Sequence, residues 1–138
     1  MTGGLVVDAS LTAAWCFEDE ATKYARDILR GAKNIYLIVP AIWPLEMVNV
    51  LLVNERRKRI TPVDTARAVT LLNELAIRVD RPSSLQAFDA TLLLARAHKL
   101  SSYDASYLEL ALREGLPLAT LDTQMRYAAS SAGVKLYA

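Results

Sequence analysis

The chain has 138 residues, of which 53% are hydrophobic and 22% charged, a balance that excludes a disordered or low-complexity protein and suits one compact domain over residues 1–138. Sixteen basic and fifteen acidic residues give a formal net charge of +1, so any surface for a polyanion would have to be local. The single cysteine, Cys16, excludes an intrachain disulfide and favours a reducing, cytoplasmic setting.

The sequence carries no signal for a membrane. The N-terminus lacks the basic and apolar regions of a secretory signal. Residues 35–53 approach the length of a membrane span, but Pro40, Pro44, Glu46 and Asn49 interrupt them. We therefore interpret this stretch as a strand, a loop and a helix, and we expect no membrane partner.

Short apolar runs predict the strands. The first of them contains adjacent valines, which is typical of a strand buried in a parallel sheet, and it ends at Asp8. The second is stopped by Pro40, which cannot donate to a ladder. The predicted strands are residues 5–9, 35–39, 76–80, 116–122 and 134–137.

Helices are expected between these strands. Ser10 is placed to cap a first helix after Asp8, and Pro44 suits the first turn of another. Gly115 and Gly133 are typical helix ends. The other predicted helices span about 20–31, 44–59, 61–75, 84–100 and 101–115, with a short one after Asp122.

Alternation of strands and helices predicts a three-layer α/β/α sandwich around a mainly parallel sheet. Ligands of such sheets bind beyond the carboxyl ends of the strands. Asp8 and Asp122 close predicted strands, Glu46 follows a strand by a short loop, and Asp104 begins the helix that leads to the strand before Asp122. We therefore expect these four acids near one edge of the sheet.

Each acid alone has a structural explanation, because acids cap helices and stabilise first turns. Together they would repel one another unless a cation lay between them. Mg²⁺ and Mn²⁺ prefer carboxylate oxygens, whereas a lone histidine, His98, and a lone cysteine offer no zinc site. Such an acidic site suits hydrolysis of a nucleic-acid phosphodiester by a metal-activated water.

Four segments carry a resemblance to a known family: "LVVDAS", "WPLEMVNVL", "LSSYDASYLELALREGLPLATLD" and "AGVKLY". Together they resemble a PIN domain, specifically a VapC-type toxin of a toxin–antitoxin pair. The resemblance spans nearly the whole chain and implies an α/β/α endoribonuclease that uses Mg²⁺ or Mn²⁺. It implies that the four metal-binding, catalytic acids of the family correspond here to Asp8, Glu46, Asp104 and Asp122.

The same resemblance implies accessory residues and partners. Ser10 and Thr120 match accessory hydroxyl positions, and Asn49 matches a polar residue one turn after the glutamate. Some members have a further acid or Asn after the last Asp, where this chain continues with residues 123–125, Thr-Gln-Met. The implied partners are an RNA substrate, a VapB-type antitoxin lying across a groove near the site, and a second copy in a homodimer.

A basic run at a predicted helix end has two interpretations. It is either a solvated face favoured by the helix dipole or a set of RNA phosphate contacts. Its members are Arg56, Arg57, Lys58 and Arg59.

Two other classes of protein share some of these features. A phosphoacceptor receiver domain needs an acidic pair after the first strand, and Asp8 has no adjacent acid. A catalytically silent PIN-like module that binds RNA or a protein partner stays open, because a sequence does not report turnover.

Overall fold

A four-stranded, all-parallel sheet lies at the centre of the molecule. The computed structural model describes residues 3–82 and 84–138. The strands are β1 (Gly4–Val7), β2 (Tyr36–Val39), β3 (Arg78–Val79) and β4 (Leu118–Ala119), in the order β3-β2-β1-β4. In the register of the sheet, Val6 of β1 pairs with Ile38 on one side and Leu118 on the other. The predicted parallel sheet is thereby confirmed.

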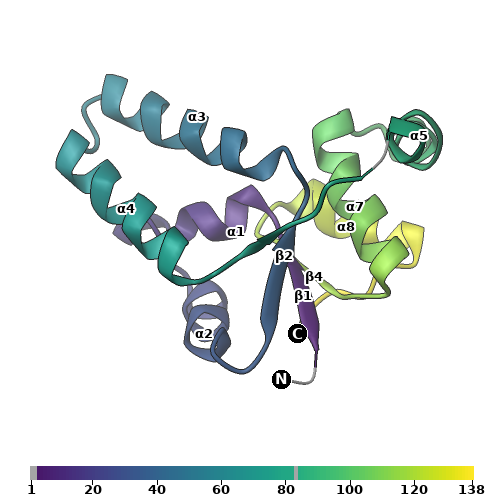
Figure 1. The fold of residues 1–138 in the computed structure, drawn as a ribbon, viewed down its shortest axis with the longest axis horizontal. Helices are drawn as coiled ribbons and strands as arrows, with labels where there is room; N and C mark the ends of the chain where they lie inside the picture. Colours follow the sequence, from purple (N-terminus) through teal and green to yellow (C-terminus); the bar gives the residue numbers. More distant parts are fainter. Residues whose placement is uncertain (1–2, 83) are drawn as a thin grey trace.

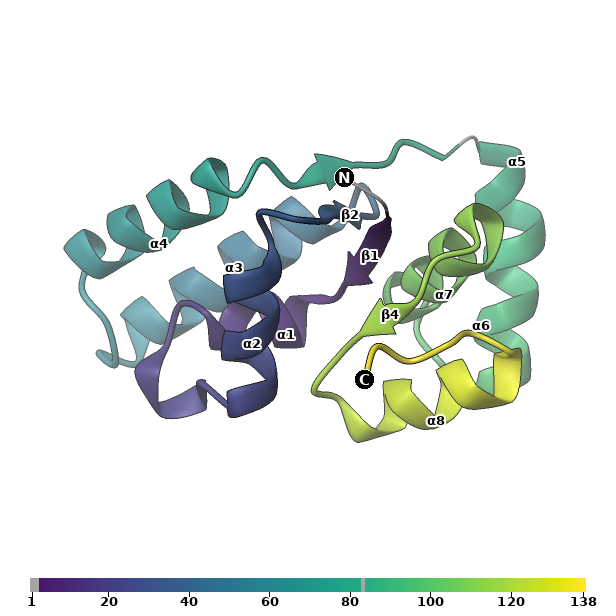
Figure 2. The ribbon, with the colours of Figure 1, turned by 90° about the horizontal axis from the view of Figure 1, so that it is seen from below.

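Helices cover both faces of this sheet. Figures 1 and 2 show α1 to α4 on one side of the strands and α5 to α8 on the other, which confirms the three-layer sandwich. Their bounds are α1 (Ala9–Ala14), α2 (Lys23–Gly31), α3 (Trp43–Arg56), α4 (Pro62–Glu74), α5 (Ser84–Gln86), α6 (Leu92–His98), α7 (Ser102–Glu114) and α8 (Thr123–Ala132). A 3₁₀ turn, η1 (Glu18–Glu20), precedes α2, and a π-helical turn, η2 (Ala87–Thr91), joins α5 to α6.

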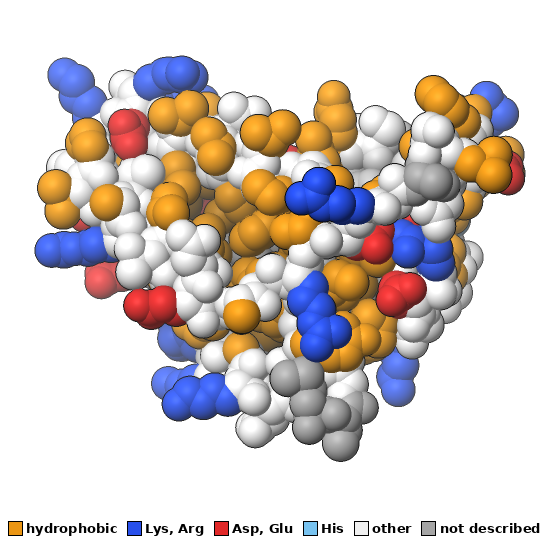
Figure 3. Space-filling view, in the orientation of Figure 1, with side chains coloured by type: hydrophobic (Ala, Val, Ile, Leu, Met, Phe, Trp, Pro, Cys, Tyr) orange, Lys and Arg blue, Asp and Glu red, His pale blue; other side chains and the backbone are white. Residues whose placement is uncertain are grey.

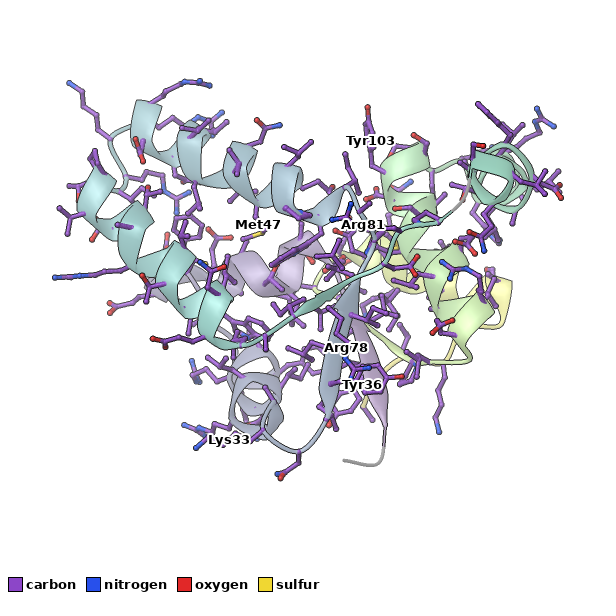
Figure 4. The ribbon with its side chains drawn as sticks, in the orientation of Figure 1. Lys33, Tyr36, Met47, Arg78, Arg81 and Tyr103 are labelled. Atoms are coloured by element: carbon purple, nitrogen blue, oxygen red, sulfur yellow. The ribbon has the colours of Figure 1, made fainter. Side chains whose placement is uncertain are left out.

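The core lies where the three layers meet. β1 is buried along its whole length because helices cover both of its faces and strands flank both of its edges. The two-residue strand β3 is held at the sheet edge, where the Arg78 guanidinium lies 4.1 Å from the centre of the Tyr36 ring (Figure 4). The largest fully buried side chains come from all layers and include Leu5, Leu11, Ile28, Tyr107, Leu108 and Leu118.

Several helix ends follow from local chemistry. Thr61 and Asp64 form a reciprocal capping box at the start of α4, with Pro62 in its first turn. Gly115 and Gly133 adopt left-handed φ values of 65° and 84°, which end α7 and α8 as predicted. No helix within residues 3–82 and 84–138 is long and apolar enough to cross a membrane.

Three expectations about the elements were wrong. Asp8, and not Ser10, caps α1, because β1 ends at Val7 and leaves Asp8 as the last extended residue. The predicted strand over residues 134–137 is a single bridge between Leu136 and Leu118, because β4 itself offers only two residues to pair. The predicted helix over residues 84–100 is interrupted by η2, so its register shifts midway.

Candidate active site

The carboxyl ends of the strands bring the four predicted acids together. Asp8 follows β1, Asp122 lies three residues beyond β4, and Glu46 and Asp104 occupy the first turns of α3 and α7. Electrostatic repulsion couples Asp8 to Asp122 and Glu46, and Asp104 to the same two residues. We call these four residues the acid cluster.

Asp8 is the most deeply held member of the acid cluster. Only 5% of it is exposed, and its Oδ1 accepts hydrogen bonds from the Ser10 hydroxyl at 2.7 Å and the Leu11 amide at 3.0 Å. Its Oδ2 accepts the Thr120 hydroxyl. Burial raises the pKa of the Asp8 carboxyl, these hydrogen bonds partly oppose the rise, and the charge of Asp122 adds to it.

The two accessory hydroxyls also connect Asp8 to the segment that carries Asp122. The Ser10 Oγ accepts from the Leu121 amide at 3.0 Å, and the Thr120 Oγ1 accepts from the Asp122 amide at 3.0 Å. The structure therefore places Thr120 directly between Asp8 and Asp122, and Ser10 between Asp8 and Leu121, the residue before Asp122.

Asp122 also caps a helix, as the structural alternative predicted. Its Oδ1 accepts from the amides of Gln124 at 2.9 Å and Met125 at 3.4 Å at the start of α8. Because these bonds use one oxygen, the carboxylate can cap α8 and still present its other oxygen to a ligand.

Asp104 is not itself a cap. The Ser101 hydroxyl performs that role for α7 by accepting from the Asp104 amide at 3.1 Å. Partial burial raises the pKa of the Asp104 carboxyl, and the charge of Asp122 raises it further. Figure 4 shows Tyr103, the residue before Asp104, in the first turn of α7.

Glu46 is held by a residue that the sequence did not single out for the site. The hydroxyl of Tyr107, on α7, donates to the Glu46 Oε1 at 2.6 Å. Burial raises the pKa of the Glu46 carboxyl, the Tyr107 bond opposes this, and the charges of Asp104 and Asp8 raise it. The available signal was spacing, because Tyr107 lies three residues after Asp104 and hence on the same helix face.

The acid cluster forms no ion pair with a cation of the described part of the chain. Among residues 3–82 and 84–138, none of the ion pairs includes Asp8, Glu46, Asp104 or Asp122. An all-carboxylate donor set fits Mg²⁺ or Mn²⁺. No three Asp, Glu, His or Cys side chains of the described residues stand close enough to hold a metal ion together, so binding one would require these carboxylates to draw closer.

A second charged group joins the end of β3 to α7. Arg113 of α7 binds both carboxylate oxygens of Asp80, which follows β3, at 2.6 and 3.3 Å. It also donates to Glu109 at 2.7 and 3.1 Å. We call these three residues the arginine cluster, and sequence reasoning did not identify it.

The predicted RNA-contact residues lie apart from the acid cluster. Arg59 pairs with Asp19 at 2.6 Å and donates to Asn54 at 2.7 Å, so its charge is already used within the chain. Arg56, Arg57 and Lys58 are exposed at the outer end of α3, where Figure 3 shows basic side chains. About 15 Å of helix separates this end from Glu46. Asn49 is exposed one turn after Glu46.

Comparisons with known proteins give consistent matches. A family model described as "PIN domain" matches residues 5–130. Ribonuclease VapC3 of Pyrobaculum aerophilum is 29% identical over 121 residues, which cover 88% of this chain and 91% of that protein.

Two solved structures share the fold. The crystal structure of Mycobacterium tuberculosis VapC20, a Sarcin-Ricin loop cleaving toxin, aligns with a TM-score of 0.66 at 17% identity, over 90% of this chain and 94% of that chain. VapBC2 of Rickettsia felis, bound to a DNA fragment from their promoter, aligns with a TM-score of 0.62 at 10% identity, over 97% of both chains.

Proposed function

The chain belongs to the PIN domain family, and on this premise we propose that it is a Mg²⁺- or Mn²⁺-dependent endoribonuclease that acts as the toxin of a toxin–antitoxin pair. The observation that carries the proposal is the acid cluster. Four carboxylates gather at the strand ends, burial and mutual repulsion raise the pKa of three of them, and no ion pair of the described chain balances them. That arrangement costs folding free energy and is explained by a role in binding an external cation.

In the proposed site, Asp8 and Asp104 would hold the principal ion, and Glu46 and Asp122 would support it directly or through water. A bound Mg²⁺ or Mn²⁺ would activate a water molecule and stabilise charge on the phosphate and the departing oxygen. The chain supplies the positioning. The hydroxyls of Ser10 and Thr120 keep Asp8 in one orientation, and the amides that begin α8 hold Asp122.

The proposed reaction is hydrolysis of an RNA phosphodiester. Attack of water in line with the leaving oxygen breaks the P–O3′ bond and leaves a 5′-phosphate and a 3′-hydroxyl. VapC3 is named a ribonuclease and VapC20 is titled a toxin that cleaves the Sarcin-Ricin loop, which supports RNA as the substrate class.

The proposed partners follow from the same relatives. The Rickettsia protein was solved as VapBC2, which supports a VapB-type antitoxin as the protein partner. We further propose a homodimer in the cytoplasm. A groove between η1 and the start of α4 is lined by Phe17, Arg59, Ile60 and Ala68. None of the four acids lines this groove, so it is not the groove near the active site in which we expect the antitoxin.

The catalytically silent alternative has one observation in its favour. The carboxylates are spread too widely, as they stand, for three of them to hold an ion. A module that binds RNA or a protein without turnover would need no such convergence, so the alternative must be tested directly.

The test is cleavage of end-labelled total RNA and transfer RNA by antitoxin-free protein in Mg²⁺, Mn²⁺ or EDTA. We expect discrete cuts in either metal, none in EDTA, and none with Asp8→Asn. The substitution keeps the size of the side chain and removes its charge, and circular dichroism verifies that the variant is folded. Absence of cuts by folded wild-type protein under all three conditions would favour the binding-only alternative.

A further inference from the structure

We propose that Tyr107 is a positioning residue for the acid cluster, and that its hydroxyl fixes the Glu46 carboxylate in the orientation in which Glu46 shares a divalent ion with Asp104. This inference rests on the proposed function, because it assigns Tyr107 a role in the affinity of the metal site. Tyr107 would not contact the ion or the substrate.

The geometry of the contact is that of a rigid support. The Tyr107 side chain is only 1% exposed, so its ring is clamped by the core and its hydroxyl is held in one place. From there it donates to the Glu46 Oε1 at 2.6 Å, a short bond of the kind formed with a charged acceptor. The bond joins residues 61 positions apart and connects α7 to α3.

Glu46 depends more on a single hydrogen bond for its orientation than Asp8 and Asp122 do. Asp8 receives three hydrogen bonds and Asp122 receives two. Glu46 has one more rotatable bond than an aspartate, and ordering it costs more side-chain entropy. Tyr107 is the one described residue that donates a hydrogen bond to its carboxylate.

The spacing on α7 explains how one helix organises two ligands. Asp104 and Tyr107 are three residues apart and so lie on one face of α7. Asp104 presents its own carboxylate, while Tyr107 holds Glu46 of α3 despite the repulsion between the two acids. Tyr107 therefore ties Glu46 to the face of α7 that carries Asp104.

A purely structural role makes a different prediction. A buried tyrosine hydroxyl needs a partner, and Glu46 could serve simply as that partner. Tyr107→Phe would then lower the stability of the fold without changing how the acids bind metal. Metal affinity, measured separately from unfolding, distinguishes the two roles.

The experiment is calorimetric titration of the metal-free full chain with Mn²⁺ alone, for the wild type, Tyr107→Phe, Tyr103→Phe and Glu46→Gln. Tyr103 provides the matched control, because the same hydroxyl is removed from the same helix but from a side chain that is 57% exposed (Figure 4). We expect Tyr107→Phe to raise the Mn²⁺ dissociation constant about 10-fold, the range seen when a supporting residue behind a ligand is lost. Tyr103→Phe should bind as the wild type does, and Glu46→Gln should bind at least as weakly as Tyr107→Phe.

RNA cleavage gives the second readout. If Tyr107 acts through metal affinity, the activity of Tyr107→Phe should fall at limiting Mn²⁺ and return to within about 2-fold of wild type at saturating Mn²⁺. Thermal melting in EDTA establishes that the variant is folded under the conditions of the titration.

Three results would overturn the inference. Unchanged Mn²⁺ affinity in Tyr107→Phe, beside weakened binding in Glu46→Gln, would show that Tyr107 only packs the core, and the proposed function would survive. Unchanged affinity in Glu46→Gln would remove the ligand that Tyr107 is said to position. Failure of the wild type to bind Mn²⁺ would contradict the proposed metal dependence itself, and the inference would fall with it.

Discussion

The acid cluster and the arginine cluster each join α7 to a residue that follows a strand, and they differ in how their charge is balanced. Both include a carboxylate residue that is only 5% exposed, Asp8 in one and Glu109 in the other. Arg113 pairs with both carboxylates of the second cluster through bidentate contacts to Asp80 and Glu109. Within residues 3–82 and 84–138, the acid cluster has hydroxyl and amide donors but no ion pair with a basic side chain. Carboxylates paired with a cation of the chain serve the fold, whereas a group of unpaired carboxylates indicates a cation from outside.

Removal of one charge from the acid cluster should have the largest effect. We expect Asp104→Asn to lower RNA cleavage at least about 1,000-fold, roughly 4 kcal/mol in activation free energy, because it deletes a principal ligand without changing shape. Initial cleavage rates at saturating Mn²⁺ provide the measurement. A folded Asp104→Asn protein with more than a tenth of wild-type activity would remove Asp104 from the proposed site.

Removal of the cation from the arginine cluster should lower the free energy of unfolding and leave RNA cleavage unchanged. Arg113→Met removes the cation from the buried Glu109 and the partly buried Asp80. We expect it to lower the free energy of unfolding by about 2–3 kcal/mol, less than for a fully buried pair because Arg113 is 25% exposed. Urea denaturation measures this loss. Activity per folded molecule should be unchanged, and a 10-fold fall in that activity would show that the two clusters are not separate in function.

The pH dependence of the free energy of unfolding should report the cost of ionising Asp8 in the acid cluster. The pKa of Asp8 is raised above its ordinary value of 3.8 in the fold, so the folded protein holds that proton more tightly than the unfolded chain does. The contribution of Asp8 to the free energy of unfolding therefore decreases as pH rises from about 3.8 through its folded pKa, and is constant above it.

The measurement is urea denaturation in EDTA at a series of pH values, for wild type and Asp8→Asn. Groups that do not interact with Asp8 titrate alike in both proteins, so the difference between them reports the ionisation of Asp8 together with its repulsion of Glu46 and Asp122. We expect the variant to gain stability relative to wild type as pH rises through this window. A difference that is constant with pH, or of opposite sign, would contradict the cost assigned to the ionised Asp8.

The exposed basic residues at the outer end of α3 should have the smallest effect. If they contact RNA phosphates, replacing Arg56 and Arg57 with Gln should weaken RNA binding a few-fold and reduce its salt dependence by up to about two counterions, without altering catalysis. Binding of labelled RNA by the Asp8→Asn protein, at several salt concentrations, provides the measurement. An unchanged salt dependence would leave the solvated-face interpretation.

Much of the fold could be predicted because residues close together in the sequence determine where many strands and helices begin and end. The buried run of β1, the helix start at Thr61 and the glycine that ends α7 all depend on a few neighbouring residues, and each appears where it was expected. The bridge at Leu136 could not be foreseen, because its pairing depends on how few residues β4 offers. A run of apolar residues indicates that a strand is present, whereas the length of that strand depends on how many residues the adjacent strand offers for pairing.

The acid cluster was predictable for a related reason. The carboxyl ends of parallel strands meet at one edge, so acids that follow strands converge without knowledge of tertiary contacts. The Tyr107 bond to Glu46 and the Arg113 contacts to Asp80 join residues 61 and 33 positions apart. Tyrosine and arginine are common on helices, and only the packing of α7 against its neighbours selects these partners.

The central claim is that the acid cluster is completed by a divalent ion, and urea denaturation of wild type and Asp8→Asn with and without Mn²⁺ tests it most directly. At ten times the dissociation constant, Mn²⁺ should raise the wild-type free energy of unfolding by about 1.4 kcal/mol. Asp8→Asn should be more stable than wild type in EDTA at neutral pH and should not respond to the same Mn²⁺ concentration. An equal response in both proteins, or none in the wild type, would contradict the claim.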